Sequence, residues 1–171
     1  GLKGDWFGRT IEELHKRHIA AFGYVTLNWN WKFMRDNMGH DFIHGKPDAE
    51  GVCGHRVTIC LNAPGYLDLV EAYTREVLEM YPVDGMRWDI LQTAEGCRCA
   101  GCRKFYRETY GEELTDWDKT EPRRVHDFYL ATTSRAVTQL RSLCKRIKPS
   151  VEIWQNSLQS YTPNLLDLAR Q

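Results

Sequence analysis

Strand-like apolar runs alternate with helical segments along this chain, and this alternation constrains the fold more than any other feature. Residues 24–29, 83–90 and 151–156 are rich in β-branched and aromatic side chains, which favour strands. Apolar residues recur at helical spacing over 11–19, 67–81, 102–111 and 125–147, and a last helix is expected to open at 162. This order predicts an α/β fold in which parallel strands alternate with helices, as in part of a (β/α)8 TIM barrel.

Two boundaries in this pattern can be assigned to particular residues. Gly23 is expected to end the first helix, and Pro122 fits the first turn of the helix that runs to 147. The polar, Gly-rich stretch from Asn30 to about Arg56 has no clear period, so we expect it to be a long loop.

The length of the chain bears on how much of a barrel it can form. A complete eight-stranded barrel usually needs about 250 residues, whereas this chain has 171. We therefore expect residues 1–171 to be a single partial barrel domain from a longer protein. Its first residue is Gly1 rather than Met, which fits an omitted upstream portion.

The charge pattern argues against two classes of partner. Lys plus Arg and Asp plus Glu are each 23, and no long run of one sign occurs. Electrostatics therefore gives no support for binding to nucleic acid or to an anionic membrane. No apolar stretch approaches the roughly 18 residues of a membrane span.

Catalytic groups in such sheets lie at the carboxyl ends of the strands. Asp89 ends the second predicted strand, and an ionisable side chain that follows an apolar run at this position suggests a functional role. Glycoside cleavage supplies one, because it needs a carboxylate facing the anomeric carbon. The alternative is a carboxylate that caps a loop or pairs with an arginine such as Arg56.

Other residues at the strand ends could contact a sugar. Trp29 and Trp31 offer flat rings for pyranose faces, while Asn28, Asn156 and His40 offer polar contacts to hydroxyls. The asparagines could equally bond to local backbone, which is the commoner use.

Two further assignments in these regions are weighed against alternatives. His40 and His44 are four residues apart, but they lack the Glu of a metalloprotease motif and fall in the predicted loop, so a metal site there is disfavoured. Trp88 alternates with Asp89 along the strand and is expected to lie in the core.

A cysteine cluster follows the second predicted strand. Cys97, Cys99 and Cys102 form a C-x-C-x-x-C motif that opens a helix, which presents several sulfurs to one point and suits a metal thiolate site. Cys60 is our choice for the fourth ligand of a closed structural zinc site, and Cys53 is its competitor. The alternative is a set of free thiols or one local disulfide.

Cys144 lies on a helical apolar face and is expected to be a core residue. The use of cysteines as reduced thiolates slightly favours a cytoplasmic location.

Several of these segments resemble known families. Residues 60–66, 97–105 and Tyr110-Gly111 resemble the zinc-bearing segment of family forty-two β-galactosidases. The resemblance implies that Cys60, Cys97, Cys99 and Cys102 hold zinc. That family also has an Asn-Glu pair at the end of the strand, where this chain has Trp88-Asp89.

Elsewhere the order of features resembles family twenty-nine α-L-fucosidases and related hypothetical glycosyl hydrolases. Residues 4–5, 23–31 and 83–89 have counterparts there. In fucosidases an Asp at the end of that strand is the nucleophile, and Asp89 matches it. In both families one catalytic carboxyl group comes from a later strand or loop.

Together these features predict a retaining glycoside hydrolase with a carbohydrate substrate and a structural zinc ion. The isolated chain is expected to show negligible hydrolysis, and a homo-oligomer is compatible with the full-length protein. The alternatives are a non-catalytic carbohydrate-binding domain and a zinc-stabilised interaction domain.

Overall fold

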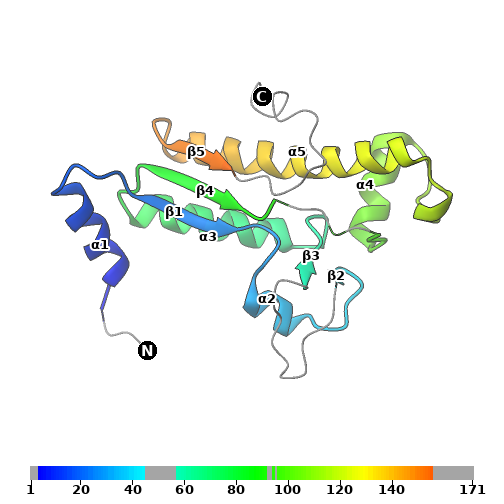
Figure 1. Ribbon diagram of the computed structural model, residues 1–171, viewed down its shortest axis with the longest axis horizontal. Helices are drawn as coiled ribbons and strands as arrows, with labels where there is room; N and C mark the ends of the chain where they lie inside the picture. The colour runs from blue at the N-terminus through cyan, green and yellow to red at the C-terminus, as the bar shows by residue number, and fades with distance from the viewer. Residues whose placement is uncertain (1–3, 45–56, 92–93, 95, 156–171) are drawn as a thin grey trace.

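Three parallel strands form the main sheet of the protein. The computed structural model describes residues 4–44, 57–91, 94 and 96–155. Strands β1 (Phe22–Thr26), β4 (Gly85–Asp89) and β5 (Glu152–Gln155) pair in parallel, in the order β1-β4-β5 (Figure 1). The parallel sheet expected from the sequence is therefore confirmed, with strand bounds that differ by a few residues.

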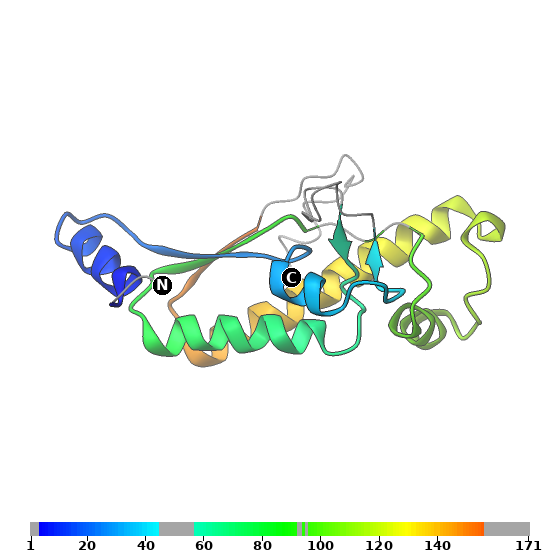
Figure 2. The ribbon, with the colours of Figure 1, turned by 90° about the horizontal axis from the view of Figure 1, so that it is seen from below.

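Helices connect and cover these strands. Helix α1 (Trp6–His15) precedes β1, α3 (Tyr66–Met80) precedes β4, and α4 (Ala100–Tyr110) and α5 (Pro122–Ile147) lie between β4 and β5. Figure 2 shows the sheet from its edge, with α3 and α5 both on the same side of it. Because consecutive parallel strands are joined through helices, the arrangement is that of successive βα units of a barrel.

The two faces of the sheet differ in burial. Met86 and Trp88 are fully buried on the face that α3 and α5 cover, so Trp88 is a core residue as its alternation with Asp89 predicts. On the other face Arg87 is exposed, and Tyr24 and Trp154 are more than half exposed. In a closed (β/α) barrel the face away from the helices points toward the axis. We call it the open face.

The prediction for Gly23 was wrong. Helix α1 ends at His15, and Gly23 lies inside β1. A Cβ on Gly23 would lie 2.7 Å from the sulfur of Met86 and 2.9 Å from a methyl group of Val77. The glycine is needed for close packing against β4 and α3, and it is not a helix stop.

The described part of the predicted loop, residues 30–44, is more structured than the sequence predicts. It contains α2 (Trp31–Asp36) and the short strand β2 (Ile43–His44), which pairs antiparallel with β3 (Thr58–Ile59). Asn30 caps α2, since its side-chain oxygen accepts a hydrogen bond of 2.8 Å from the backbone N–H of Phe33. A six-residue helix is too short to show a period, so this cap was the only signal.

Further elements complete the described chain. A short 3₁₀ helix, η1 (Trp117–Lys119), connects α4 to α5. As expected, α5 begins at Pro122. Lys145, in the last turn of α5, donates hydrogen bonds to the carbonyls of Pro149 and Val151, which follow the helix. Among the helices of the described residues, none combines the length and apolarity needed to cross a membrane. The helix predicted from 162 lies outside the described residues.

Asp84 joins the amino ends of β1 and β4. Its carboxylate accepts hydrogen bonds from the backbone N–H of Ala21 at 2.7 Å and from His15 at 2.8 Å. The Ala21 N–H, followed by His15, lowers the pKa of this carboxyl group. Asp84 therefore holds the strand ends that lie opposite the edge carrying Asp89.

Candidate active site and metal centre

Asp89 lies at the carboxyl end of β4. It pairs with Thr26, the last residue of β1, and its carbonyl accepts a hydrogen bond of 2.9 Å from the N–H of Leu27. By strand alternation the Asp89 side chain shares the open face with Arg87 rather than the buried face of Trp88. This is the position that catalytic carboxylates occupy in (β/α) barrels.

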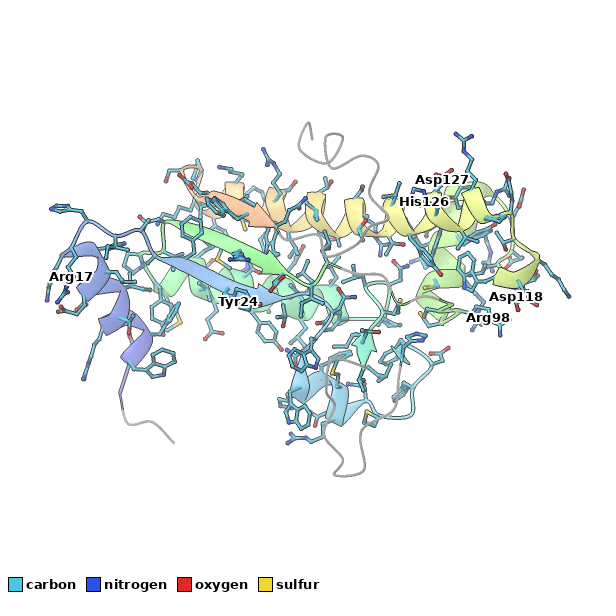
Figure 3. The ribbon with its side chains drawn as sticks, viewed as in Figure 1. Arg17, Tyr24, Arg98, Asp118, His126 and Asp127 are labelled. Carbon is cyan, nitrogen blue, oxygen red and sulfur yellow. The ribbon has the colours of Figure 1, made fainter. Side chains whose placement is uncertain are left out.

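Two neighbours hold the Asp89 carboxylate. The Tyr24 hydroxyl donates a hydrogen bond to Oδ2, and the backbone N–H of Ile90 donates one of 2.8 Å to Oδ1. The hydrogen bond to Asp89 also raises the pKa of Tyr24. Tyr24, labelled in Figure 3, comes from β1 two residues before the position that faces Asp89. No sequence pattern predicted this pair, because it arises from the register between the two strands.

The backbone directly after Asp89 is strained. Ile90 has a φ of 53°, a left-handed conformation that β-branched residues rarely adopt. Such a conformation costs about 1–3 kcal/mol and persists only where the surrounding structure imposes it. Here it accompanies the short-range hydrogen bond from the Ile90 N–H to Asp89, which orients the carboxylate.

The three parallel strands carry one other carboxylate, Glu152. In the register of the sheet Glu152 faces Gly85, at the amino end of β4. Asp89 lies four positions after Gly85, which corresponds to about 13 Å along a strand. Retaining glycosidases place their two carboxyl groups about 5–5.5 Å apart, so Glu152 does not fit the role of a partner to Asp89.

The residues predicted to contact substrate have different environments. Asn28 is fully buried, and its amide donates a hydrogen bond to the Ile59 carbonyl, which is the backbone-bonding use that the sequence left open. Trp29 is half-buried and packs against the core, whereas Trp31 is 46% exposed at the start of α2. His40 is exposed and stacks on Phe42 with ring centroids 4.9 Å apart. Asn156 lies outside the described residues.

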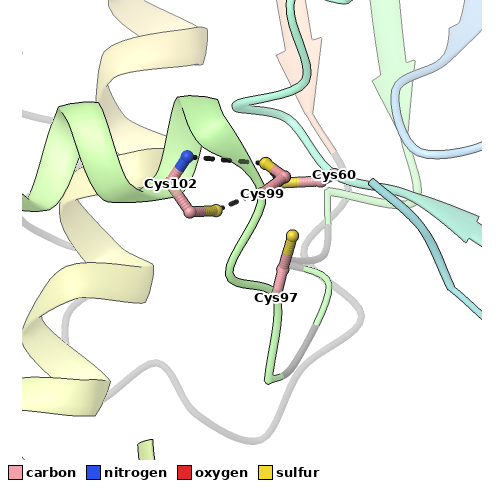
Figure 4. A group of neighbouring side chains, drawn as sticks. All are labelled: Cys60, Cys97, Cys99 and Cys102. Atoms are coloured by element: carbon pink, nitrogen blue, oxygen red, sulfur yellow. Dashed lines mark hydrogen bonds between the residues drawn. The ribbon is translucent and has the colours of Figure 1, made fainter. Parts of the chain in front are cut away.

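Four cysteines converge beside the carboxyl end of the sheet (Figure 4). The sulfurs of Cys60, Cys97, Cys99 and Cys102 all lie within 4.8 Å of one another, and all four residues are buried. Cys60 lies in the turn between β3 and α3, while the other three lie before or within the first turn of α4. The competitor Cys53 lies outside the described residues. Cys144 is buried in α5, as expected of a core residue.

The spacing of the sulfurs fits a tetrahedral metal site. The Cys60 sulfur lies 3.4 Å from that of Cys102 and 4.0 Å from that of Cys99. A zinc–sulfur distance of about 2.3 Å places the corners of a tetrahedron about 3.8 Å apart. All four thiols are free, so a local disulfide between them does not occur. These four residues could hold a metal ion.

Three sulfurs of the cluster, those of Cys60, Cys99 and Cys102, have an N–H donor nearby. The Asn62 backbone N–H lies 3.3 Å from the Cys60 sulfur, and the Asn62 side-chain amide lies 3.4 Å from that of Cys102. The Cys102 N–H donates to Cys99 at 3.5 Å. The neighbouring Cys97 raises the pKa of His44, whose Nε2 atom is buried with no hydrogen-bond partner among the described residues. The N–H donors favour the thiolate form and orient metal ligands.

The crowded thiols also affect one another. The hydrogen bond with Cys102 raises the pKa of the Cys60 thiol and lowers that of Cys97. Four thiolates in contact repel one another. A divalent cation removes this repulsion.

His44 belongs to this cluster rather than to the predicted histidine pair. It lies in β2, where residues alternate between faces, so it does not share a helical face with His40.

Aromatic side chains and one glycine fix the loop that carries the cluster. The indole N–H of Trp117 donates a 2.9 Å hydrogen bond to the Cys97 carbonyl, and the Tyr129 hydroxyl accepts one of 2.9 Å from the Gly96 N–H. A Cβ on Gly101 would lie 1.7 Å from the Asn62 carbonyl oxygen. Only glycine at this position lets α4 approach the Cys60 turn so closely, a constraint that the motif alone did not reveal.

Several solved structures of glycoside hydrolases resemble this chain. Alpha-L-fucosidase isoenzyme 2 from Paenibacillus thiaminolyticus matches with a TM-score of 0.73 at 20% identity, covering 98% of this chain and 25% of the fucosidase. A cold-adapted β-galactosidase from Rahnella sp. R3 gives 0.64 at 17% identity, covering 89% of this chain and 28% of that enzyme. A β-galactosidase from Bacillus circulans sp. alkalophilus gives 0.65 at 16% identity, covering 88% and 28%. No protein-family model matches the chain, and no curated protein matches it in sequence.

These likenesses establish the fold. The chain has the fold of part of a TIM barrel, which confirms the predicted fold class. It spans about a quarter of the length of each of these structures.

Proposed function

We propose that this chain is part of a retaining glycoside hydrolase barrel in which Asp89 is the nucleophile. The observation that carries the proposal is the position of Asp89 on the open face, at the carboxyl end of β4. The solved structures with the same fold are named as a fucosidase and galactosidases, which supports a carbohydrate substrate.

The contacts of Asp89 suit a nucleophile. A carboxylate that attacks the anomeric carbon must be ionised, oriented and unable to rotate away. Hydrogen bonds from Tyr24 and Ile90 hold both carboxylate oxygens of Asp89 in place. The half-exposed ring of Tyr24 keeps this group at the surface of the open face.

The acid/base carboxyl group would come from outside the three described strands. Glu152 is at the wrong end of the sheet, so a second carboxylate must be supplied by another part of the barrel. The chain alone is accordingly expected to show negligible hydrolysis. Trp31 and His40, both exposed beyond the end of β1, would extend the sugar-binding surface.

We also propose that the four cysteines hold a structural zinc ion. Four thiolates at tetrahedral spacing, with no position left for water or substrate, are typical of structural zinc sites. The ion would join the Cys60 turn to the first turn of α4 and so stiffen the loop that follows Asp89.

The direct test is the hydrolysis of aryl glycosides by the complete protein and its Asp89→Gly variant. Loss of the nucleophile should lower kcat by about 10³-fold or more, equivalent to roughly 4 kcal/mol. Azide should restore part of the rate and give a glycosyl azide of inverted configuration, since it can occupy the space of the missing carboxylate.

Two results would argue for the alternatives. Turnover unchanged in Asp89→Gly would exclude Asp89 as the nucleophile. Saturable binding of sugars without turnover in the wild-type protein would favour the non-catalytic carbohydrate-binding domain.

A further inference from the structure

The four-cysteine site has a neighbour that contacts it twice. Asn62, only 6% exposed, lies two residues after Cys60. Its backbone N–H donates to the Cys60 sulfur at 3.3 Å, and its side-chain amide donates to the Cys102 sulfur at 3.4 Å. One residue thus links a sulfur from the β3–α3 turn to a sulfur from α4.

Arg135 determines which way the Asn62 amide faces. Its guanidinium donates a 2.5 Å hydrogen bond to the Asn62 Oδ1 atom. Because arginine can only donate, the oxygen of the amide must face Arg135 and the NH₂ group must face Cys102. The NH₂ group also lies 3.2 Å from the Thr132 hydroxyl, so every polar atom of the amide has a partner.

Arg135 has no carboxylate in direct contact among the described residues, and the charges that favour its cationic form are those of Glu108 and of the cluster residues Cys102 and Cys60. Among the described residues Arg135 forms no ion pair, although it is half-buried, and its Nε atom is buried with no hydrogen-bond partner. Its guanidinium lies over the ring of Phe105, 4.2 Å from the centroid. Burial lowers the pKa of Arg135, which marks a cation held at some energetic cost.

A metal-bound cluster would add negative charge on the side of Arg135 that faces Asn62. Four thiolates around a divalent cation carry a net charge of −2 in a buried site, and such a site needs N–H donors and a nearby cation. Arg135 donates a hydrogen bond to Asn62, and Asn62 donates one to the Cys102 sulfur. Asn62 thus supplies the N–H donor, and Arg135 supplies the nearby cation. Arg135 also lines a cavity of about 440 Å³ with Asn62 and Phe105, which keeps part of the guanidinium solvated.

We propose that Asn62 and Arg135 are positioning residues of the four-cysteine metal site, with Asn62 orienting two sulfurs while Arg135 fixes its amide and balances the thiolate charge. This inference rests on the zinc site proposed above. It assigns a role to two residues that no motif in the sequence identifies.

The test compares zinc affinity in the wild type and three variants, measured by competition with a chromophoric chelator. Asn62→Asp keeps the acceptor for Arg135 but removes the donor to Cys102 and adds a like charge. Arg135→Met keeps the packing over Phe105 but removes the charge. Both should weaken zinc binding by about 10- to 100-fold, as loss of such outer contacts does elsewhere. Arg141→Met, an exposed position on the same helix, should leave the affinity unchanged.

Two further measurements separate a positioning role from a general folding defect. Relative to Arg141→Met, Arg135→Met should lose less thermal stability in metal-free than in zinc-bound protein, because the thiolate charge that Arg135 balances is complete only with the metal. With Co²⁺, the thiolate-to-metal absorption of Asn62→Asp should shift in energy relative to wild type. Arg135→Lys, which keeps the charge without the planar fork, should lose less affinity than Arg135→Met.

The outcomes are distinguishable from those of the zinc proposal. Wild-type protein that binds neither Zn²⁺ nor Co²⁺ would overturn the metal site and this inference together. Tight metal binding that stays within threefold of wild type in both Asn62→Asp and Arg135→Met would overturn this inference alone. An equal loss of stability by Arg135→Met in metal-free and metal-bound protein would also contradict it.

Discussion

Gly101 provides a sharp test of the packing around the cysteine cluster. In Gly101→Ala the new Cβ would lie 1.7 Å from the Asn62 carbonyl oxygen and 2.8 Å from its carbon. Both atoms belong to the backbone, so no side-chain rotation can relieve the contact. The separation must grow from 1.7 Å to at least 3.0 Å, which moves the first turn of α4 away from the Cys60 turn.

The size of this movement sets the expected effect. Metal sites tolerate changes of about 0.2 Å in their ligand distances, and the required shift is several times larger. At least one sulfur should therefore leave the coordination sphere. Overpacking of this kind costs about 1–3 kcal/mol, which lowers Tm by about 2–12 °C in a protein of this size.

The assay is zinc content per chain together with Tm from circular dichroism. Ala100→Gly, a change at the exposed neighbouring position, removes a methyl group without touching Asn62 and should retain zinc. A Gly101→Ala protein with wild-type zinc content and Tm would refute the close approach of α4 to the Cys60 turn.

Three further changes test other contacts. Cys102→Ser should lower the zinc content to well below one ion per chain and should also lower Tm. Cys144→Ala should retain zinc, since the Cys144 sulfur lies outside the cluster. Atomic absorption measures the zinc content of both variants. Trp117→Phe keeps an aromatic ring but removes the indole N–H that bonds to the cluster loop and some ring packing, so the free energy of unfolding in urea should fall by at least about 1 kcal/mol. The Ala21 N–H lowers the pKa of Asp84, so this carboxylate stabilises the fold above its unfolded pKa of about 3.9, and that stability disappears as pH falls through the lower folded value. Asp84→Asn should therefore lower Tm at pH 7 and reduce the loss of Tm on acidification below about pH 4.

The sequence predicted the features that depend on local pattern. Alternating runs gave the three parallel strands, and the crowding of three cysteines over six residues gave a site that the fold then completed with Cys60. The position of Asp89 followed from its place after an apolar run. Each of these depends on spacing along the chain, which the printed sequence contains.

Features that depend on contacts between distant elements were missed. Gly23 was read as a helix stop because its packing partner, Met86, lies in another strand. The pair of Tyr24 and Asp89 depends on strand register, and the relay from Arg135 to Asn62 joins α5 to the Cys60 turn. Glycine and polar residues fill so many roles that only the three-dimensional neighbours decide among them.

The central claim is that Asp89 attacks the anomeric carbon. The most direct measurement incubates the complete protein with an activated 2-deoxy-2-fluoro glycoside, digests it, and locates the covalently bound sugar by peptide mass spectrometry. The account predicts one fluoro-sugar per chain, attached to Asp89. A label on another residue, or continued turnover of aryl glycosides with no trapped intermediate, would contradict it.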